Sequence, residues 1–584
     1  MFYSGLSPQK VCRYALQYDE LWGSLNHVIG SYPKKLAPDM SSIASQGLAT
    51  GWLDLCKQHH QSCNHSKSES SWLPTRLVFI KLLGAARTVH MVETSLLSPS
   101  TTYIALSHCW GKNPILTLTL DNYANLKHGL PLSVLPKTFR EAFEIARWFQ
   151  VEYLWIDSLC IIQDSAEDWR KEAITMQSVY KNALLTVAAT GAVDGSVGCF
   201  QARDLTLNTA IEVPVTREGQ ASERMVCFDR WLWADGISKA PLNTRAWVVQ
   251  ERLLSRRVLH FGAQQMFWEC RELDACEVCP QGLPSILAEL HRFKSTGSGR
   301  TLEDNLAKPK YATVYEQWEY IVDAYSRSNL TRTSDKVVAL SGIAAELAST
   351  YEQEYLAGLW RQHLPEQLLW KASLEPTENG RNSLASRATS YRAPSWSWLS
   401  IDGPVDAGSS HGKPVLIKID DAHVDGDAYS IRAGFLRLLG ALRDAVCEAD
   451  TNGSVRLFFD LPVEGDAFGE MDDKSARPPD SVICLPINTG FFSMDGENVM
   501  FLEGLMLVPT QQGGNEFLRV GWFSADNQYF CEAIVHGSLD PSVARTLDQS
   551  PAQGSEIHQK GSDGNHGVNA TQYSHLWRDI LTIR

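Results

Sequence analysis

The chain has 584 residues, of which 44% are hydrophobic and 21% charged; this is typical of a globular protein and too long for a single core. Its formal net charge of −14, with no basic run, argues against a nucleic-acid partner, because phosphate binding requires a basic face. No stretch approaches the roughly 18 consecutive apolar residues of a membrane span, and the first residues lack the pattern of a signal peptide. An odd total of 13 Cys is typical of reduced thiols, so we expect a cytoplasmic protein without a membrane span.

The first half of the chain is predicted to change from helices to an α/β domain. Residues 1–100 are expected to be a mostly helical N-terminal region that ends in the strand-like run Arg76–Leu83. From Tyr103 onwards, short apolar runs alternate with amphipathic helices, which predicts βαβ units and a parallel sheet. The predicted strands are Tyr103–Ser107, Tyr153–Asp157 and Ala183–Thr190.

The two helices between these strands carry start signals. The first is predicted to begin with a capping box of Thr138 and Glu141, in which each side chain accepts from a free backbone N–H. Asp164 or Ser165 is expected to cap the second helix. Its buried stripe is predicted to comprise Trp169, Ala173, Met176 and Tyr180.

The remainder of the chain is predicted to be helical and then β-rich. Residues 256–270 are expected to form two strands around a Gly-Ala turn, and residues 280–375 are expected to be mostly helical. Alternating segments predict a β-rich C-terminal lobe over 406–537, followed by a polar tail, 538–584, with a short helix near 575–581.

Polar residues follow the predicted parallel strands. Ser107 ends the first strand and is followed by His108 and Trp110, while Asp157 ends the second strand and Thr190 ends the third. Ligands of open parallel sheets bind at the carboxyl ends of the strands, so we expect these side chains to share one site.

Two carboxylates near this edge are candidates for acid–base chemistry. Asp157 is placed to bind ligand hydroxyls or to cap the next turn. Glu172 lies on the flank of the predicted buried stripe, where a carboxylate either pairs with a basic group or has a raised pKa suited to chemistry. Asp164 and Asp168 lie near a helix start, where the helix dipole alone favours negative charge.

A third polar cluster lies further along the chain. Arg245 and Glu251, with Trp247 and Gln250 between them, are expected near the same sheet edge. They form either a ligand-binding group or a structural Arg–Glu pair, which is the commoner explanation.

No metal site is expected from the sequence. Cys56, His60 and Cys63, with His59 and His65 nearby, offer thiolate and imidazole ligands, but their spacing matches no standard zinc finger and a second ligand pair is missing. A packed or solvated helix end is the favoured interpretation.

The other cysteine and serine motifs lack the sequence context that a redox or hydrolase site requires. Cys276 and Cys279 form a lone CxxC, with Cys270 upstream, but no thioredoxin-like strand and helix precede it. Ser410 is the centre of a literal G-x-S-x-G without the strand and helix of a nucleophile elbow. A hydrolase that uses Ser107 or Cys109 with His108 remains a minor alternative, because neighbours on an extended chain point to opposite faces.

Three segments together resemble the signatures of the fungal heterokaryon-incompatibility (HET) domain: YIALSHCWG (103–111), YLWIDSLCIIQDSAEDW (153–169) and NTRAWVVQERLLS (243–255). The resemblance covers residues 103–251 and implies self/non-self recognition and programmed cell death. It divides the chain into the N-terminal region, the HET domain, a β-hairpin and helical extension over 252–405, the β-rich lobe and the tail.

HET domains have been related to the TIR fold, a flavodoxin-like α/β domain, and some TIR domains cleave NAD+ between nicotinamide and ribose. This relation implies NAD+ as a candidate substrate rather than a bound cofactor. Glu172 is the first choice of catalytic carboxylate, and Asp157 is the second candidate. The implied ligand-binding residues are Ser107, His108, Trp110, Arg245, Trp247 and Glu251. The alternative is a non-catalytic scaffold that binds a protein partner or a second copy of itself.

Overall fold

The computed structural model divides into two compact units, Met1–Thr313 with Ser328–Leu330 and Val314–Arg327 with Thr331–Arg584. It describes residues 14–16, 36–64, 72–83, 86–204, 211–215, 223–229, 231–283, 310–330, 332–373, 385–408, 413–427, 429–450, 454–461, 463, 465–494, 497–511, 514–536 and 579–584. His65, Ser410 and residues 575–578 lie outside this part. None of the described helices combines the length and apolar character needed to cross a membrane.

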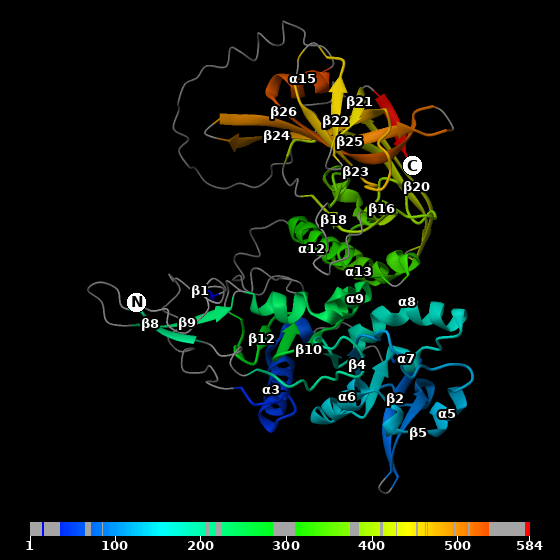
Figure 1. Cartoon of the computed structure of the whole chain (residues 1–584). Coiled ribbons are helices and arrows are strands. Elements are labelled where there is room, and N and C mark those ends of the chain that lie inside the picture. Colours follow the sequence, from blue (N-terminus) through cyan, green and yellow to red (C-terminus); the bar gives the residue numbers. More distant parts are fainter. Residues whose placement is uncertain are drawn as a thin grey trace. The chain divides into compact units, whose positions relative to one another are not determined.

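The first unit is built on a nine-stranded mixed sheet (Figure 1) with the order β12-β11-β10-β7-β4-β6-β2-β3-β5. Its strands are β2 (Arg76–Leu83), β3 (Ala86–Glu93), β4 (Tyr103–Ser107), β5 (Leu130–Pro131), β6 (Tyr153–Ile156), β7 (Leu185–Ala188), β10 (Arg257–Phe261), β11 (Met266–Cys270) and β12 (Asp274–Cys276). The central strands β6, β4, β7 and β10 run parallel to one another. The predicted parallel sheet is therefore confirmed. Every residue of β4 and β7 is buried, because both faces of the sheet are covered.

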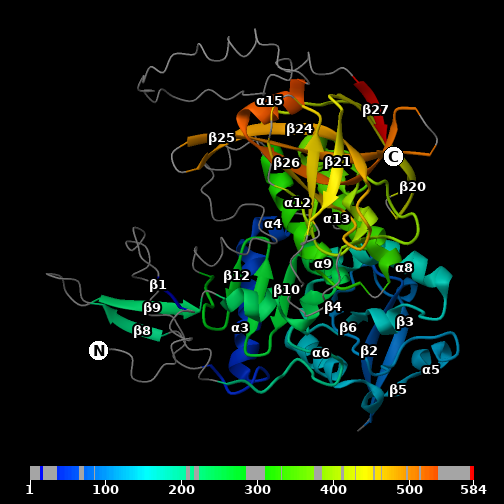
Figure 2. The same cartoon turned by 45° about the horizontal axis from the view of Figure 1, so that its top comes forward.

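Helices lie on both faces of this sheet. The crossover from β4 to β6 passes through α6 (Lys137–Trp148), and the crossover from β6 to β7 passes through α8 (Ala166–Asn182). These two crossovers run in opposite directions along the sheet, so right-handed connections place the helices on opposite faces, as Figures 1 and 2 show. Helix α9 (Ala246–Leu254) precedes β10 and packs beside α8.

Of the two predicted helix starts, the one at α8 is confirmed and the capping box at α6 is wrong. Ser165 caps α8 by accepting a hydrogen bond from the N–H of Asp168. The capping box of Thr138 and Glu141 is wrong: α6 begins at Lys137 after Pro136, Thr138 donates to the carbonyl of Gly195, and Glu141 accepts from two backbone N–H groups near 199. Both side chains bind the loop that follows β7, which sequence spacing does not reveal.

The N-terminal part of the first unit is only partly helical. Helices α3 (Ile43–His59) and α4 (Gln61–Asn64) precede two strands, β2 and β3, that extend the main sheet. Trp52 of α3 packs against Trp268 of β11, with ring centroids 6.2 Å apart. This contact places α3 beside the β11 end of the sheet. The other elements here are β1 (Tyr14–Leu16), β8 (Ile211–Val215) and β9 (Glu223–Asp229), which form a small sheet, and the short helices α5 (Tyr123–His128) and α7 (Asp157–Cys160).

The second unit is helical and then β-rich, as predicted. Its larger helices are α12 (Lys310–Ser326) and α13 (Lys336–Tyr351), with shorter helices α14 (Leu364–Gln367) and α15 (Gln528–His536). Six antiparallel strands close into a barrel, in the order β26 (Glu516–Asp526), β23 (Ala467–Met471), β22 (Ser454–Phe459), β21 (Arg443–Ala449), β24 (Ser481–Met494) and β25 (Glu497–Pro509), which pairs with β26 again. Strands β19 (Lys418–Asp427) and β20 (Ser430–Gly440) continue the same sheet. The small two-stranded pairs are β13 (Tyr355–Leu356) with β14 (Leu359–Trp360), β15 (Lys371–Ala372) with β18 (Val405–Asp406), and β16 (Ser386–Arg387) with β17 (Ile401–Asp402).

The helix predicted near 575–581 is wrong where the structure describes it. Residues Asp579–Ile583 form strand β27, which pairs antiparallel with β20 and parallel with β26. The alternation of Ile580, Leu581 and Ile583 is too short to distinguish a strand from a helix by periodicity. The long-range pairing decides its conformation.

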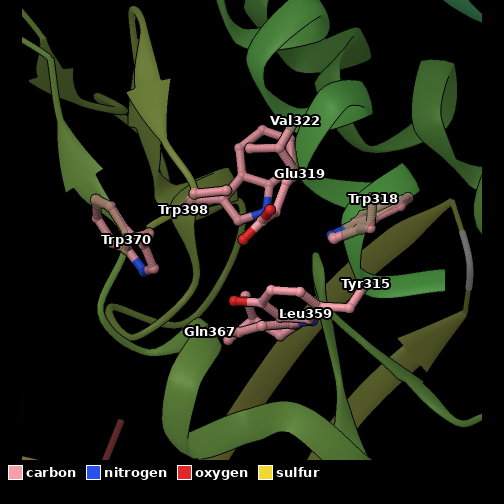
Figure 3. A pocket seen from close by; sticks show the side chains of 9 residues that line it. Tyr315, Trp318, Glu319, Val322, Leu359, Gln367, Trp370 and Trp398 are labelled. Carbon is pink, nitrogen blue, oxygen red and sulfur yellow. The ribbon is translucent and has the colours of Figure 1, made fainter. Parts of the chain in front are cut away.

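A small pocket lies among the helices and loops of the second unit (Figure 3). Its lining is mainly aromatic, with Tyr315, Trp318, Trp370 and Trp398 around it and Gln367 as one of its polar members. The space is about the size of one water molecule. We therefore regard it as a gap in an aromatic core rather than a ligand site.

Candidate functional site

The carboxyl ends of β4 and β6 bring three predicted site residues into direct contact. Asp157 is the first residue of α7, directly after β6, and its carboxylate faces the loop that follows β4. His108 Nε2 lies 3.0 Å from Asp157 Oδ1, and the indole Nε1–H of Trp110 donates to Asp157 Oδ2 over 2.8 Å. His108 is buried, whereas the Asp157 side chain remains 22% exposed. Asp157 and the half-buried Trp110 are thus the members of this cluster that reach solvent.

A second pair joins the end of β4 to α9. The Ser107 hydroxyl donates to Glu251 Oε2 over 2.5 Å, and both residues are buried. Tyr180, from the buried face of α8, is also hydrogen-bonded to Glu251. The Ser107 hydroxyl is therefore committed to a carboxylate rather than to His108, which removes the geometry that a Ser–His nucleophile would need.

Arg245 links these two pairs. Its guanidinium donates to the backbone carbonyl of His108, and its charge acts on both Asp157 and Glu251. Trp247, in contrast, packs partly buried against the hydrophobic core, where it serves as a core residue. The structure brings together all the predicted ligand-binding residues except Trp247.

Glu172 belongs to a neighbouring, deeper cluster. Arg76 forms a close ion pair with Asp168 and lies 3.9 Å from Glu172 Oε1, which is too long for a hydrogen bond. Glu172 is 2% exposed, and its Oε1 has no hydrogen-bond partner among the described residues. Arg76 also donates to the carbonyl of Cys160, so this cluster lies beneath α7, which begins at Asp157.

The carboxylates of the two clusters differ in acidity. Burial raises the pKa of Glu251 and of Glu172 above the usual value of a glutamate, despite the nearby arginines. Burial acts in the same sense on Asp157, but the charge and hydrogen bond of His108, with Arg245 and Trp110, outweigh it and hold the pKa of Asp157 below its usual value. The site therefore places a partly exposed carboxyl with a lowered pKa close to buried carboxyls with raised pKa values.

The cysteines near this edge are unsuited to nucleophilic chemistry. Burial raises the pKa of Cys109 to about 11 and that of Cys160 to about 12. Both thiols are therefore protonated near neutral pH and act as small buried hydrophobes. A cysteine hydrolase at this position has no support.

Sequence reasoning did not identify Arg76 and Tyr180 as members of these clusters. Arg76 had a usable signal, because it is a basic residue at the start of an otherwise apolar strand. Tyr180 was predicted only as a core residue, and its hydroxyl contact with Glu251 follows from the packing of α8 on α9. Elsewhere in the first unit, Cys56, His60, Cys63 and Cys270 place their ligand atoms within 4.8 Å of one another, a group of metal-binding type.

Comparison with protein families gives one match, the family described as "Heterokaryon incompatibility protein (HET)", over residues 103–251. No curated protein and no solved structure matched. The family match begins at β4 and ends at Glu251 in α9, so it includes the whole Ser107–Asp157–Arg245–Glu251 cluster. Residues 103–251 of this chain therefore match the heterokaryon-incompatibility (HET) domain family.

Proposed function

We propose that this chain is an effector of heterokaryon-incompatibility-type self/non-self recognition, and that its HET domain provokes cell death by cleaving NAD+. The observation that carries the chemical part is the Asp157 carboxylate. It is favoured in its ionised form, it is partly exposed at the carboxyl edge of the parallel sheet, and it is held by Trp110 and His108.

The proposed reaction breaks the bond between the nicotinamide nitrogen and ribose C1′. Nicotinamide leaves with the bonding electron pair, and positive charge develops on the ribose ring. The negative charge of Asp157 stabilises that positive charge. A water then adds to C1′ and releases a proton, which gives ADP-ribose and nicotinamide. The ring of Trp110, half-buried beside the carboxylate, offers a face on which nicotinamide can stack.

The order of the parallel strands supports a relation to the TIR fold. If β4, β6, β7 and β10 are numbered by their place in the chain, the sheet order β6-β4-β7-β10 reads 2-1-3-4, which is the order of flavodoxin-like sheets. Ligands of such sheets bind where the first and third strands diverge. Ser107 is the last residue of the first of these strands, β4, and His108 follows it.

Burial favours Asp157 over Glu172 as the carboxylate that contacts substrate. Glu172 is 2% exposed beneath α7, whereas Asp157 reaches the surface. In this proposal Glu172 acts through Arg76 and α7 and has no contact with NAD+.

The second candidate function is a non-catalytic scaffold, with self-association or a protein partner as its activity. The observation in its favour is that the polar groups satisfy one another: Ser107 binds Glu251, and Asp157 binds both His108 and Trp110. Such mutual bonding is also what a structural polar network requires.

The experiment measures nicotinamide release from NAD+ by the purified full chain at high protein concentration. Asp157→Asn should lower release by about 100-fold or more, Glu172→Gln by less than tenfold, and Glu167→Gln, an exposed carboxylate in the first turn of α8, should have no effect. Cell-killing activity, measured in parallel, should follow release. An absence of release from the wild type, with killing intact in Asp157→Asn, would support the scaffold instead.

A further inference from the structure

The N-terminal helix α3 ends beside the β11 end of the main sheet, and three cysteines and one histidine meet there. Cys56 lies in the last turn of α3, and His60 is the capping residue that follows the helix, with its backbone N–H donating to the carbonyl of Cys56. The short helix α4 brings Cys63 back to the same place, and Cys270 arrives as the last residue of β11. The four ligand atoms lie within 4.8 Å of one another.

We propose that Cys56, His60, Cys63 and Cys270 bind one structural Zn²⁺ ion. Tetrahedral zinc bound through Zn–S bonds of about 2.3 Å has sulfur atoms about 3.8 Å apart, so the four atoms need to contract only slightly around the ion. Cys270 Sγ lies 3.3 Å from His60 Nδ1, which identifies Nδ1 as the imidazole ligand. Thiolate and imidazole are ligands that select zinc over magnesium or calcium.

The surroundings of the four residues are those of a closed site. All three cysteines are buried, with exposed fractions of 0% for Cys56 and 1% for Cys63 and Cys270. Four protein ligands complete a tetrahedron and leave no position for substrate, as in structural rather than catalytic zinc sites. The ion would therefore stabilise the fold and take no part in the reaction at Asp157.

Second-sphere contacts already orient the sulfur ligands. The Arg257 Nε–H donates to Cys56 Sγ over 3.1 Å, and the backbone N–H of Leu273 donates to Cys270 Sγ over 3.3 Å. The guanidinium offsets part of the negative charge that three thiolates bring to one Zn²⁺. The Asn64 side-chain amide donates to the carbonyls of Cys56 and His60 over 2.8 and 2.7 Å, which holds the end of α3 in position.

The consequence of this site is a link between parts of the chain that are far apart in sequence. Cys270 and His60 are separated by 210 residues, and α3 lies outside the segment that matches the HET family. Cys270 and β11 also lie outside it, so zinc binding would fix α3 to β11 and, through β10, to the strands of the matched segment. It would add the free energy of metal binding to the stability of the first unit.

Elemental analysis of the full chain, purified under reducing conditions without chelator, is the first test. We expect about one zinc per chain. Cys63→Ala and Cys270→Ala should retain less than one tenth of it, while Cys199→Ala, which removes a buried thiol elsewhere in the first unit, should retain all. Wild-type protein without zinc after purification and reconstitution, zinc unchanged in Cys270→Ala, iron or copper in place of zinc, or a disulfide between two of these cysteines would overturn the proposal.

Cobalt substitution keeps the test decisive if the alanine variants fail to fold. Wild-type protein loaded with Co²⁺ should show tetrahedral absorption bands and a thiolate-to-cobalt charge-transfer band from three sulfurs. His60→Cys adds a fourth thiolate and should raise that band by about one third, in proportion to the ligand count. His59→Cys, at the exposed neighbouring position, should leave it unchanged. Equal spectra for His60→Cys and wild type would rule His60 out as a ligand and overturn the assignment.

Discussion

Trp110 and His108 hold the two oxygens of Asp157 separately: the indole N–H binds Oδ2 over 2.8 Å, and His108 Nε2 lies 3.0 Å from Oδ1. The backbone N–H of Ser158 also donates to Oδ1 over 2.7 Å. The carboxylate plane is therefore fixed from both sides, and these contacts favour its charged form.

Asp157→Asn should destabilise the fold in a pH-dependent way. Because the pKa of Asp157 is lowered in the folded state, the stability that it contributes is present above the unfolded pKa, near 3.9, and is lost as pH falls through the folded pKa. Hydrogen bonds to a charged group contribute about 1.5–3 kcal/mol each. We therefore expect the free energy of unfolding of Asp157→Asn to be about 2 kcal/mol lower than that of the wild type at pH 7, with a smaller difference towards pH 3. Urea unfolding at both pH values measures it, with Glu167→Gln as the control; a loss that is independent of pH would contradict the prediction.

Glu172→Gln should have the opposite pH dependence. Burial raises the pKa of Glu172, so folding favours its protonated form. The stability that this contributes is present below the unfolded pKa, near 4.3, and is lost as pH rises through the folded pKa. The free energy of unfolding of Glu172→Gln, relative to wild type, should therefore increase from pH 4.5 to pH 7. A decrease over that range would show that Glu172 forms a functional ion pair with Arg76.

Arg519 in the second unit should be essential for stability. Its side chain is 0% exposed, binds Asp472 over 3.0 Å, donates to the carbonyls of Leu368 and Trp370, and stacks on the ring of Trp370. Arg519→Met removes one of the two arginines that bind the buried Asp472 and leaves Arg387, whose Nη2 lies 3.2 Å from Asp472 Oδ2. Because the removed partner is buried with several hydrogen bonds, the change should still cost about 3 kcal/mol.

The matched control for Arg519→Met is Arg477→Met. Arg477 is 89% exposed and lies 3.7 Å from Asp480, which is 98% exposed. Exposed ion pairs contribute little, so urea unfolding of this variant should match the wild type. Equal losses of unfolding free energy in the two variants would contradict the prediction that the buried Arg519–Asp472 pair is essential for stability.

Lys336 should make the second unit more stable at alkaline pH. Burial, reinforced by Arg392, lowers the pKa of Lys336 to about 7, although its ammonium can donate to the carbonyls of Trp398 and Ile401. The unfolded pKa is near 10.4, so between pH 7 and 10 the unfolded chain binds more protons than the folded chain, and stability rises with pH. Relative to Lys336→Met, the wild type should gain up to about 1.4 kcal/mol per pH unit in this range. If the difference in unfolding free energy between wild type and Lys336→Met did not change between pH 7 and 10, Lys336 would be charged in the folded protein.

Local patterns in the sequence were sufficient for the centre of the sheet. The apolar runs that became β4, β6 and β7 are short, bounded by polar residues and separated by helices, and these features depend on neighbours in the chain. The convergence of Ser107, Asp157 and Arg245 could also be expected, because the carboxyl ends of parallel strands share an edge.

Contacts between distant segments could not be predicted in the same way. Nothing near Cys63 in the sequence indicates that Cys270 would complete its cluster, because that meeting depends on α3 packing against β11. The same reason explains Glu141, which binds the loop after β7 instead of its own helix start, and Asp579–Ile583, whose conformation is decided by β20 and β26.

The pairing of the main sheet also affects how shorter versions of the protein should be made. The family match starts at β4 and stops in α9, yet β6 is hydrogen-bonded to β2 and β7 to β10, and both partner strands lie outside the match. A fragment trimmed to 103–251 would leave two apolar strands with unpaired backbone groups along both flanks, which is a template for aggregation. Cutting instead at 36 and 283 retains the flanking strands and α3, so the hydrogen bonds of the sheet, rather than family resemblance, should decide where a shorter chain begins and ends.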